Sequence, residues 1–358
     1  MQSETNLTTL ANQKLALPRQ SPRLQVPRWL YPALVAAIYL IWASYLFISD
    51  NWTLLRELWP VTATMALGSF VAGATPQGGA TVAFPVFTKV LQIPAGEART
   101  FGLMIQAVGM TMAGVLILVR RIKILPHVIG WVSLGGALGI VLGAYLGQIP
   151  LPYPKILFTF VATAFGVALI LARWVLKWTP CDDIAHWSNQ HRLIFTGVGL
   201  LGGAFAANTG AGTDMLAFMV MTLAFGINEK ISTPTTVIIM ALNSIVGFFV
   251  YGVLQNSIGP AFDYWLVAIP IVIIGAPLGA FVASIIKRDY LILFILGLIL
   301  LELSTTLWLI PFSTTAVLVT TLVVVVFGLS FWGMLAYRYR SQDREKPPIS
   351  LSPNLPSK

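Results

Sequence analysis

Long apolar runs, separated by short polar segments, dominate the chain. One such run is YPALVAAIYLIWASYLFIS from Tyr31, and another is TTAVLVTTLVVVVFGLSFWGMLAY from Thr314. Each run is long enough to cross a hydrocarbon core of about 30 Å as a helix. The pattern predicts an all-α polytopic membrane protein. Its expected full spans, about eight in number, are 30–48, 101–119, 126–147, 155–175, 233–252, 262–286, 290–310 and 314–336.

Two further apolar regions, 58–91 and 193–226, are each interrupted by glycines. The first contains TPQGG from Thr75 and the second TGAGT from Thr209. Gly and Pro disrupt regular structure, and within lipid each freed backbone group needs a partner, so such breaks survive only against protein or a polar cavity. The breaks therefore indicate a site. Each region is either a helical hairpin that enters halfway or a pair of short crossings, which would raise the total to about twelve.

The two broken regions belong to an internal repeat. AGATPQGGATVAFPVF from Ala72 aligns with AANTGAGTDMLAFMVM from Ala206 at a shift of 134 positions. Residues 100–114 match 233–247 at a shift of 133, and GAYLG from Gly143 matches GAPLG from Gly275 at 132. Three matches in order, with slowly drifting spacing, favour duplication over chance similarity of apolar text.

In this layout the two halves have opposite orientations, which is the inverted-repeat plan of secondary transporters, with broken helices that meet near the bilayer midplane. The predicted organisation is a disordered cytoplasmic tail (1–29), a first transmembrane half (30–177, repeat core 58–175), a cytoplasmic connecting loop (178–192), a second half (193–340, repeat core 193–310) and a second disordered cytoplasmic tail (341–358).

Charge sets the orientation. The chain has 22 Lys and Arg residues and a net charge of +9, yet only 10% of its residues are charged. With the N-terminus in the cytoplasm, every basic residue falls on the inner side except Arg56, Lys89, Arg99 and Lys155, as the positive-inside rule expects. We therefore expect both termini in the cytoplasm, and no basic face indicates nucleic-acid binding.

Other function classes find little support in the residues. The single cysteine, Cys181, cannot form an internal disulfide. The polar cluster around it, with Asp182, Asp183, His186 and His191, is more typical of a solvated connector than of a metal site. No constellation of nucleophile, acid and base predicts an enzyme, no ATP-binding motif occurs, and we expect no cofactor. Energy should come from ion or substrate gradients.

Two helices that begin near Gly78 and Gly212, aimed at each other, would present unpaired N–H groups and the positive ends of their dipoles to a small anion. Thr75, Gln77, Thr209 and Thr213 would add side-chain donors. An alternative is that the glycines only permit close helix packing, which we prefer for Gly139, Gly143 and Gly147. The expected substrate-binding residues are Thr75, Pro76, Gln77, Gly78, Gly79, Asn208, Thr209, Gly210, Gly212 and Thr213.

Acidic residues inside the apolar regions suggest coupling to a proton or ion. Asp214, in the first turn after Gly212, would repel an anion unless it is protonated or paired. It either loads a proton as the anion binds or caps the helix and points away. Glu302 has a transport role or a structural one with a partner in the bundle. Gln106, Asn243 and Ser244 either line the pathway or form interhelical hydrogen bonds.

The segment GGATVAFPVF from Gly78 resembles the TauE/SafE family of sulfite and organosulfur-anion permeases, with Ala80 in place of the third glycine of the family pattern. The resemblance spans about 58–309, and in the second copy Thr213, Asp214 and Met219 replace the family's Gly, Gly and Pro. It implies a secondary carrier in the cell membrane that exports a sulfur-containing anion such as sulfite or an organosulfonate. The alternatives are an anion channel with the same site and a cation-coupled carrier of another small solute.

Overall fold

The computed structural model describes residues 26–345 except 80–82, 84–85, 147–148, 150–152, 176–178, 185–186 and 310–313. Helices form all the regular elements of this part of the chain, and the only β-type pairing there is a single bridge between Cys181 and Ile227. The predicted all-α class is confirmed.

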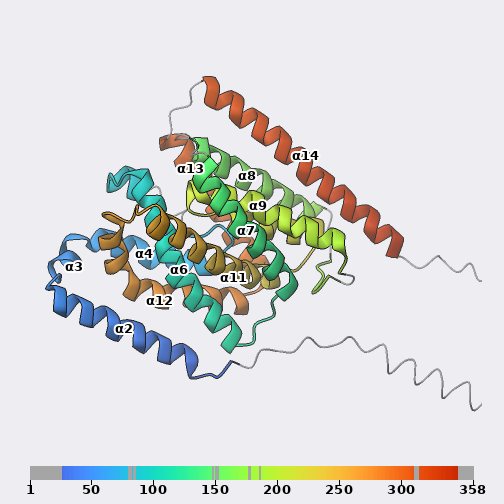
Figure 1. Ribbon diagram of the computed structural model, residues 1–358. Coiled ribbons are helices and arrows are strands. Elements are labelled where there is room, and N and C mark those ends of the chain that lie inside the picture. Colours follow the sequence, from blue (N-terminus) through green and yellow to red (C-terminus); the bar gives the residue numbers. More distant parts are fainter. Residues whose placement is uncertain are drawn as a thin grey trace, which may run out of the picture.

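Seven of the described helical segments are long and apolar enough to cross a membrane (Figure 1). They are α2 (Leu30–Ser49), α6 (Ala95–Val119), α7 (Pro126–Leu146), α8 with η2 (Tyr153–Ile170, Leu171–Val175), α11 with η4 (Glu229–Phe248, Phe249–Leu254), α12 (Ala261–Ile285) and α13 (Arg288–Leu309). Seven of the eight expected spans are therefore present, most of them within a few residues of their predicted bounds.

The eighth expected span lies in α14 (Thr314–Glu345), whose apolar helical stretch, Thr320–Met334, is shorter than a full span. The helix also continues to Glu345, into the tail that the sequence predicts to be disordered from 341. Nothing between 337 and 345 stops a helix, since the first proline beyond the span is Pro347. The remaining tail residues and the segment 1–25 lie outside the described residues.

The two broken regions have unequal arms. In the first, α3 (Thr53–Glu57) precedes α4 (Trp59–Ala74), and η1 (Val86–Val90) follows the break. In the second, α9 (Asn189–Thr209) has 21 residues and α10 (Thr213–Met219) continues into η3 (Val220–Ala224). The first arm of this region is longer than expected, because the helix starts in the connecting loop, where Ser188 caps it by accepting from the His191 N–H.

Small residues let α9 pack closely along α7, and the two helices run parallel. A Cβ on Gly143 would lie 2.8 Å from the Ala204 carbonyl oxygen, and one on Gly139 would overlap the Leu200 carbonyl. The packing role expected for these two glycines is therefore confirmed, whereas Gly147 lies outside the described residues. In the same way α4 runs parallel to α12, and a Cβ on Gly73 would lie 3.0 Å from the Ala280 nitrogen.

Most of the main helix contacts join a helix of one sequence half to a helix of the other. The first arm α4 packs on α12, and its counterpart α9 packs on α7. Likewise α6 contacts α12, and its counterpart α11 contacts α7, while α6 and α11 pack on each other and so do α8 and α13. The pairing is symmetric between the two halves, and the inverted repeat itself stays a prediction.

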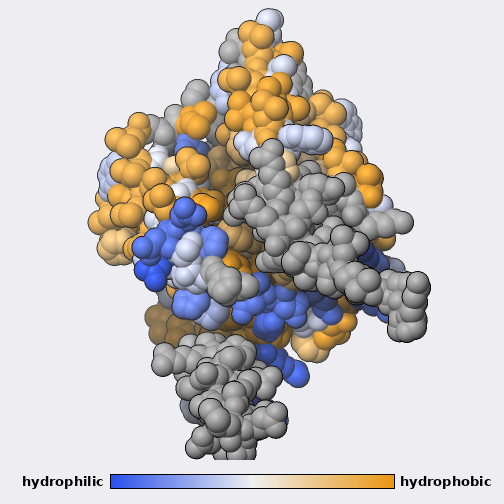
Figure 2. Space-filling view, turned by 90° about the vertical axis from the view of Figure 1, so that its right-hand side faces the viewer, coloured by the Kyte–Doolittle hydropathy of each residue, from blue (hydrophilic) through white to orange (hydrophobic). Residues whose placement is uncertain are grey.

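The surface divides into apolar and polar zones. Helices α2 and α14 both run obliquely in Figure 1, and the beginning of α2 and the end of α14 each lie at the lower-right end of the respective helix. Figure 2 looks at the right-hand side of this view and shows hydrophilic side chains gathered in its centre and hydrophobic ones around them. Large apolar side chains are exposed on the flanks, for example Ile48 on α2 (83% exposed) and Trp308 on α13 (86%). Such flanks suit a lipid environment.

Candidate functional site

The two breaks lie in contact at the centre of the molecule. Gly78 of the first break has a φ of +67°, a left-handed conformation that favours glycine. A Cβ there would lie 3.7 Å from the Cβ of Ala211 and 3.8 Å from Oδ2 of Asp214, both in the second break. It would also lie 2.8 Å from the methyl group of Met240 on α11. A side chain at position 78 would therefore occupy the junction between the breaks.

Each break folds back to the middle of its own first arm. A Cβ on Gly79 would lie 2.9 Å from the Gly68 carbonyl oxygen, and one on Gly202 would lie 2.7 Å from the Cα of Thr213. These two contacts are equivalent under the shift of 134 that aligns the two breaks. The contact of Asn243 with Gly136, the midpoint of α7, places the second break near half the length of that helix.

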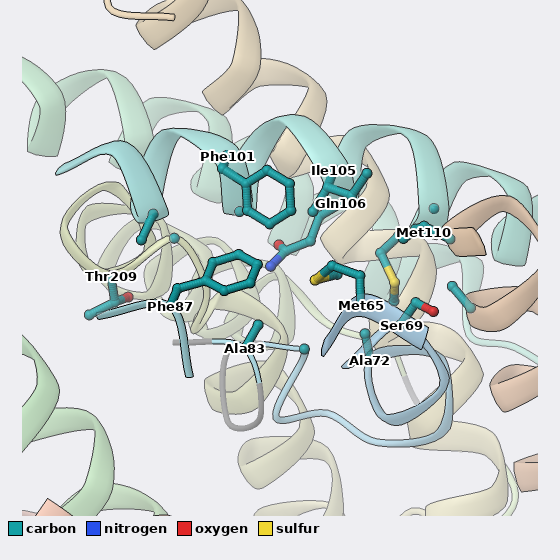
Figure 3. Close-up of a pocket in the computed structure, with 17 residues that line it drawn as sticks. Met65, Ser69, Ala72, Ala83, Phe87, Phe101, Ile105, Gln106, Met110 and Thr209 are labelled. Atoms are coloured by element: carbon teal, nitrogen blue, oxygen red, sulfur yellow. The ribbon is translucent and has the colours of Figure 1, made fainter. Parts of the chain in front are cut away.

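The first break borders an apolar pocket with an empty volume of about 530 Å³, its open mouth included. Figure 3 shows the Gln106 amide pointing into this pocket among Phe87, Phe101 and Met65. The pocket is lined by Met65, Ser69, Ala72, Gly79, Ala83, Phe87, Ala98, Phe101, Gly102, Ile105, Gln106, Gly109, Met110, Thr209, Gly210, Val272 and Ala276.

The second break borders a smaller pocket of about 220 Å³, again with its mouth included, which we call the polar pocket. It is lined by Leu103, Gln106, Ile140, Ala206, Gly210, Ala211, Gly212, Thr213, Asp214, Met240, Asn243 and Ser244. Four residues predicted for the pathway or for coupling thus gather in one place. Within this group, the Ser244 hydroxyl and the Gln106 Oε1 are hydrogen-bonded at 3.1 Å.

Four lining positions of one pocket correspond to four of the other when the two halves are aligned. At the shifts of 132 to 134 already described, Ala72 corresponds to Ala206, Gly79 to Thr213, Met110 to Asn243, and Ile140 to Val272. Gln106 and Gly210 line both pockets and therefore stand between them. The repeat thus produces two similar cavities on either side of a shared wall.

Several buried polar atoms at the breaks have no hydrogen-bond partner. They are both amide atoms of Gln77, Oγ1 of Thr213, Oδ2 of Asp214 and both amide atoms of Asn243. The other carboxylate oxygen of Asp214 accepts from the Gly212 N–H at 3.0 Å, so Asp214 caps its helix with one oxygen and leaves the second unpaired. A buried polar group without a partner is costly, and such a cluster indicates a binding site.

Other predicted site residues have their side chains occupied locally. The Thr75 hydroxyl donates to the Val71 carbonyl at 2.9 Å, and the Thr209 hydroxyl donates to the Phe205 carbonyl at 3.0 Å. The Asn208 amide donates to the Ala204 carbonyl and its Oδ1 accepts from the Ile149 N–H at 2.8 Å. Asn208 therefore fastens the end of α9 to the segment after α7, and Pro76 is buried within the first break.

Glu302 lies away from both pockets. It is buried on α13, forms an ion pair with Lys155 at the start of α8 and accepts a hydrogen bond of 2.8 Å from the Thr159 hydroxyl. The partner within the bundle that the sequence left open is thus Lys155. In the described part of the connecting loop, Asp182 pairs with Lys123, and no group of three or more metal-ligating residues occurs anywhere in the described chain, with His186 outside it.

Sequence reasoning missed the apolar lining of the first pocket and the contact of Met240 with Gly78. Methionine, phenylalanine and alanine are ordinary core residues, so nothing in their local pattern marks them as lining. The repeat alignment offered one usable signal, because it places Met110 opposite Asn243.

The TauE/SafE sulfite exporter family model matches residues 61–305, which is most of the chain. No curated protein and no solved structure gave a match. The chain therefore belongs to the TauE/SafE family, whose members are membrane transporters rather than enzymes. Together with the apolar helices, this makes it a multi-pass membrane permease.

Proposed function

We propose that this permease is a secondary-active carrier for a small sulfur-containing anion, such as sulfite or an organosulfonate, and that it exports this anion from the cytoplasm. The proposal places the anion at the two facing breaks. The observation that carries it is the pair of repeat-equivalent pockets that meet at Gln106 and Gly210. A site shared between two related halves is what alternating access requires.

The chemistry of the breaks suits a weakly held anion. The continuous apolar helix Thr213–Ala224 starts at the second break, and the positive end of its dipole lies there. The unpaired Gln77 amide adds a donor from the first break. None of the residues that line either pocket is a lysine or arginine. The anion would be held by dipoles alone, which favours release on the far side.

Asp214 places a limit on where the anion binds. In a poorly solvated pocket its charge would repel an anion strongly. The anion therefore occupies the apolar pocket, whose lining does not include Asp214, and Asp214 couples anion binding to a proton or another cation. Glu302, already paired with Lys155, has a structural role in this scheme.

The orientation rests on two observations. The start of α2 and the end of α14 each lie at the lower-right end of the respective helix in Figure 1, and most basic residues belong to segments that this arrangement puts on the same side. With the positive-inside rule, we place both termini in the cytoplasm and the protein in the cell membrane.

A channel with the same site would show flux far above that of a carrier and no stimulation by counter-flow.

The test is transport of radiolabelled sulfite and sulfate into proteoliposomes, with and without an imposed pH gradient. We expect saturable flux in the wild type and its loss in Gly78→Leu and in Gly212→Leu. Gly130→Leu and Gly297→Leu serve as matched controls, because a Cβ at either position meets no atom within 4 Å. Equal flux in all four variants would refute the site, and linear, unsaturable flux would favour the channel.

A further inference from the structure

Three buried side-chain oxygens of the polar pocket have no partner, and no described ionisable group pairs with them. Thr213, Asp214 and Asn243 are each at least 97% buried, and each contributes a side-chain oxygen without a partner. Asp214 is the only ionisable residue in the lining, and none of the ion pairs in the described chain includes it. A buried carboxylate needs protonation or a bound cation to balance its charge.

The size of the pocket restricts its occupant. Its volume of about 220 Å³ includes the open mouth and the gaps between atoms, and the space that a separate occupant can fill is about that of one water molecule. A sulfur oxyanion has several heavy atoms and would not fit beside the Asp214 carboxylate. The occupant is therefore a single atom or a water molecule.

The number of unpaired oxygens favours a metal cation over a proton as the group that neutralises Asp214. A proton on Asp214 would satisfy one carboxylate oxygen and leave the Thr213 hydroxyl and the Asn243 amide unpaired. A cation would suit all three oxygens, because hard cations take oxygen ligands and all three residues line the same small pocket. The single carboxylate balances one positive charge, which favours a monovalent ion over Ca²⁺ or Mg²⁺. In carriers Na⁺ is coordinated by unwound carbonyls and by the C-terminal ends of broken helices, and Gly210, which ends α9, lines this pocket.

We propose that the polar pocket is a Na⁺ site, coordinated by the side-chain oxygens of Thr213, Asp214 and Asn243. The proposal rests on the carrier function above and deepens it by identifying the cation that Asp214 couples to the anion. Gln106, which lines both pockets and is hydrogen-bonded to Ser244, links the cation site to the anion site. Because Na⁺ neutralises Asp214, each ion should raise the affinity for the other by the same factor.

The first pocket serves as the internal comparison. Its equivalents of Thr213 and Asn243 are Gly79 and Met110, and the sequence has Ala80 where the second copy has Asp214. All three oxygen ligands are therefore missing from the first copy. The duplication supplies two cavities, and only one of them carries the ligands for a cation.

The experiment is equilibrium binding of ²²Na⁺ to the purified full-length protein in detergent, at constant ionic strength with choline or K⁺ as the replacement ion. We expect saturable binding of one Na⁺ per chain. Asp214→Asn should weaken it at least about 10-fold and Thr213→Val about 3- to 10-fold. The matched controls are Asp263→Asn, an acidic residue outside both pockets, and Thr163→Val, whose hydroxyl donates within its own helix.

Folding of each variant is checked by size exclusion and by its unfolding temperature in choline, and Asn243→Asp is measured beside them. This variant keeps an oxygen ligand, so Na⁺ binding should survive in it. Absence of Na⁺-specific binding in the wild type, or equal binding in Asp214→Asn, would overturn the inference. Anion flux without Na⁺ binding would leave the carrier function intact, whereas Na⁺ binding without sulfite or sulfate flux would support the cation site and reopen the substrate class.

Discussion

The two breaks take equivalent places in the fold, but the residues that line their pockets differ in chemistry. Both fold back to the same point of their first arm, Gly79 against Gly68 and Thr213 against Gly202, and both border a cavity made of equivalent positions. Yet the first cavity is lined by methionine and phenylalanine, and the second by Thr213, Asp214 and Asn243. If the two regions are copies, as the sequence predicts, they share these backbone contacts and differ in their side chains.

The difference lies in which break holds unsatisfied polar groups. Around the first break, the unpaired atoms are the two amide atoms of Gln77, which lines neither pocket, and Ser69 Oγ in the apolar pocket, while the Thr75 hydroxyl is bonded within its own helix. Around the second break, side-chain atoms of Thr213, Asp214 and Asn243 lack partners, and all three residues line one small pocket. A protein keeps such costly groups where a ligand satisfies them, so the comparison assigns the cation to one half and leaves the anion with the other.

The largest expected effect comes from disturbing the close helix packing that the two halves share. In Gly203→Leu the new side chain would overlap the Gly136 carbonyl, and in Gly73→Leu it would overlap that of Ala276. Each should destabilise the protein by about 3 kcal/mol or more, because backbone cannot move aside cheaply. Thermal unfolding in detergent measures this, and Gly297→Leu is the control. A tolerated substitution in one half only would show that the packing is not equivalent.

The next effect comes from making the first pocket resemble the second. Met110→Asn places an amide in a cavity lined mainly by apolar groups, where the Ser69 hydroxyl can satisfy only part of its hydrogen-bonding capacity. We expect a loss of about 2 to 3 kcal/mol from the partly unpaired amide and the lost packing. Unfolding temperature is the readout, and Met110→Leu is the volume-matched control. A stable Met110→Asn variant would mean that water already satisfies polar groups in this cavity.

The reverse substitution should have the opposite sign for stability. Asn243→Met removes two orphan amide atoms from the polar pocket, so we expect about 1 to 2 kcal/mol of stabilisation in the absence of Na⁺. The same change should reduce anion flux at least about 10-fold, because the cation site is lost. Measuring both quantities on one preparation tests the trade-off. Loss of stability together with loss of flux would indicate a purely structural Asn243.

The smallest effect concerns the wall between the pockets. Ser244→Ala removes the hydroxyl that is hydrogen-bonded to Gln106 and should cost about 1 kcal/mol of stability. If this bond links the two sites, the variant should also halve, or lower further, the factor by which Na⁺ raises the affinity for sulfite. The comparison variant is Thr111→Val, whose native hydroxyl bonds its own helix at Ala107. If Na⁺ raises the affinity for sulfite by the same factor in Ser244→Ala as in the wild type, this hydrogen bond does not couple the two pockets.

The sequence predicted the helical class, seven spans and the location of both breaks, because apolar length and glycine placement are local properties. It also named Gln106, Asp214, Asn243, Ser244 and Glu302 as candidates for the pathway or for coupling, and the first four line one pocket while Glu302 does not. It could not predict the apolar lining of the first pocket, because ordinary core residues acquire that role only from their tertiary neighbours. Nor could it predict that Glu302 pairs with Lys155, which is 147 positions away and was expected outside the apolar core.

The parallel packing of α4 on α12 and of α9 on α7 determines which parts of the protein can move as a unit. The closest backbone contacts join a broken helix of one sequence half to an unbroken helix of the other. We therefore expect any moving unit to combine helices from both halves of the chain rather than to coincide with one half. If the chain is cut in the connecting loop, the two fragments should stay associated, because each contributes helices that pack against the other.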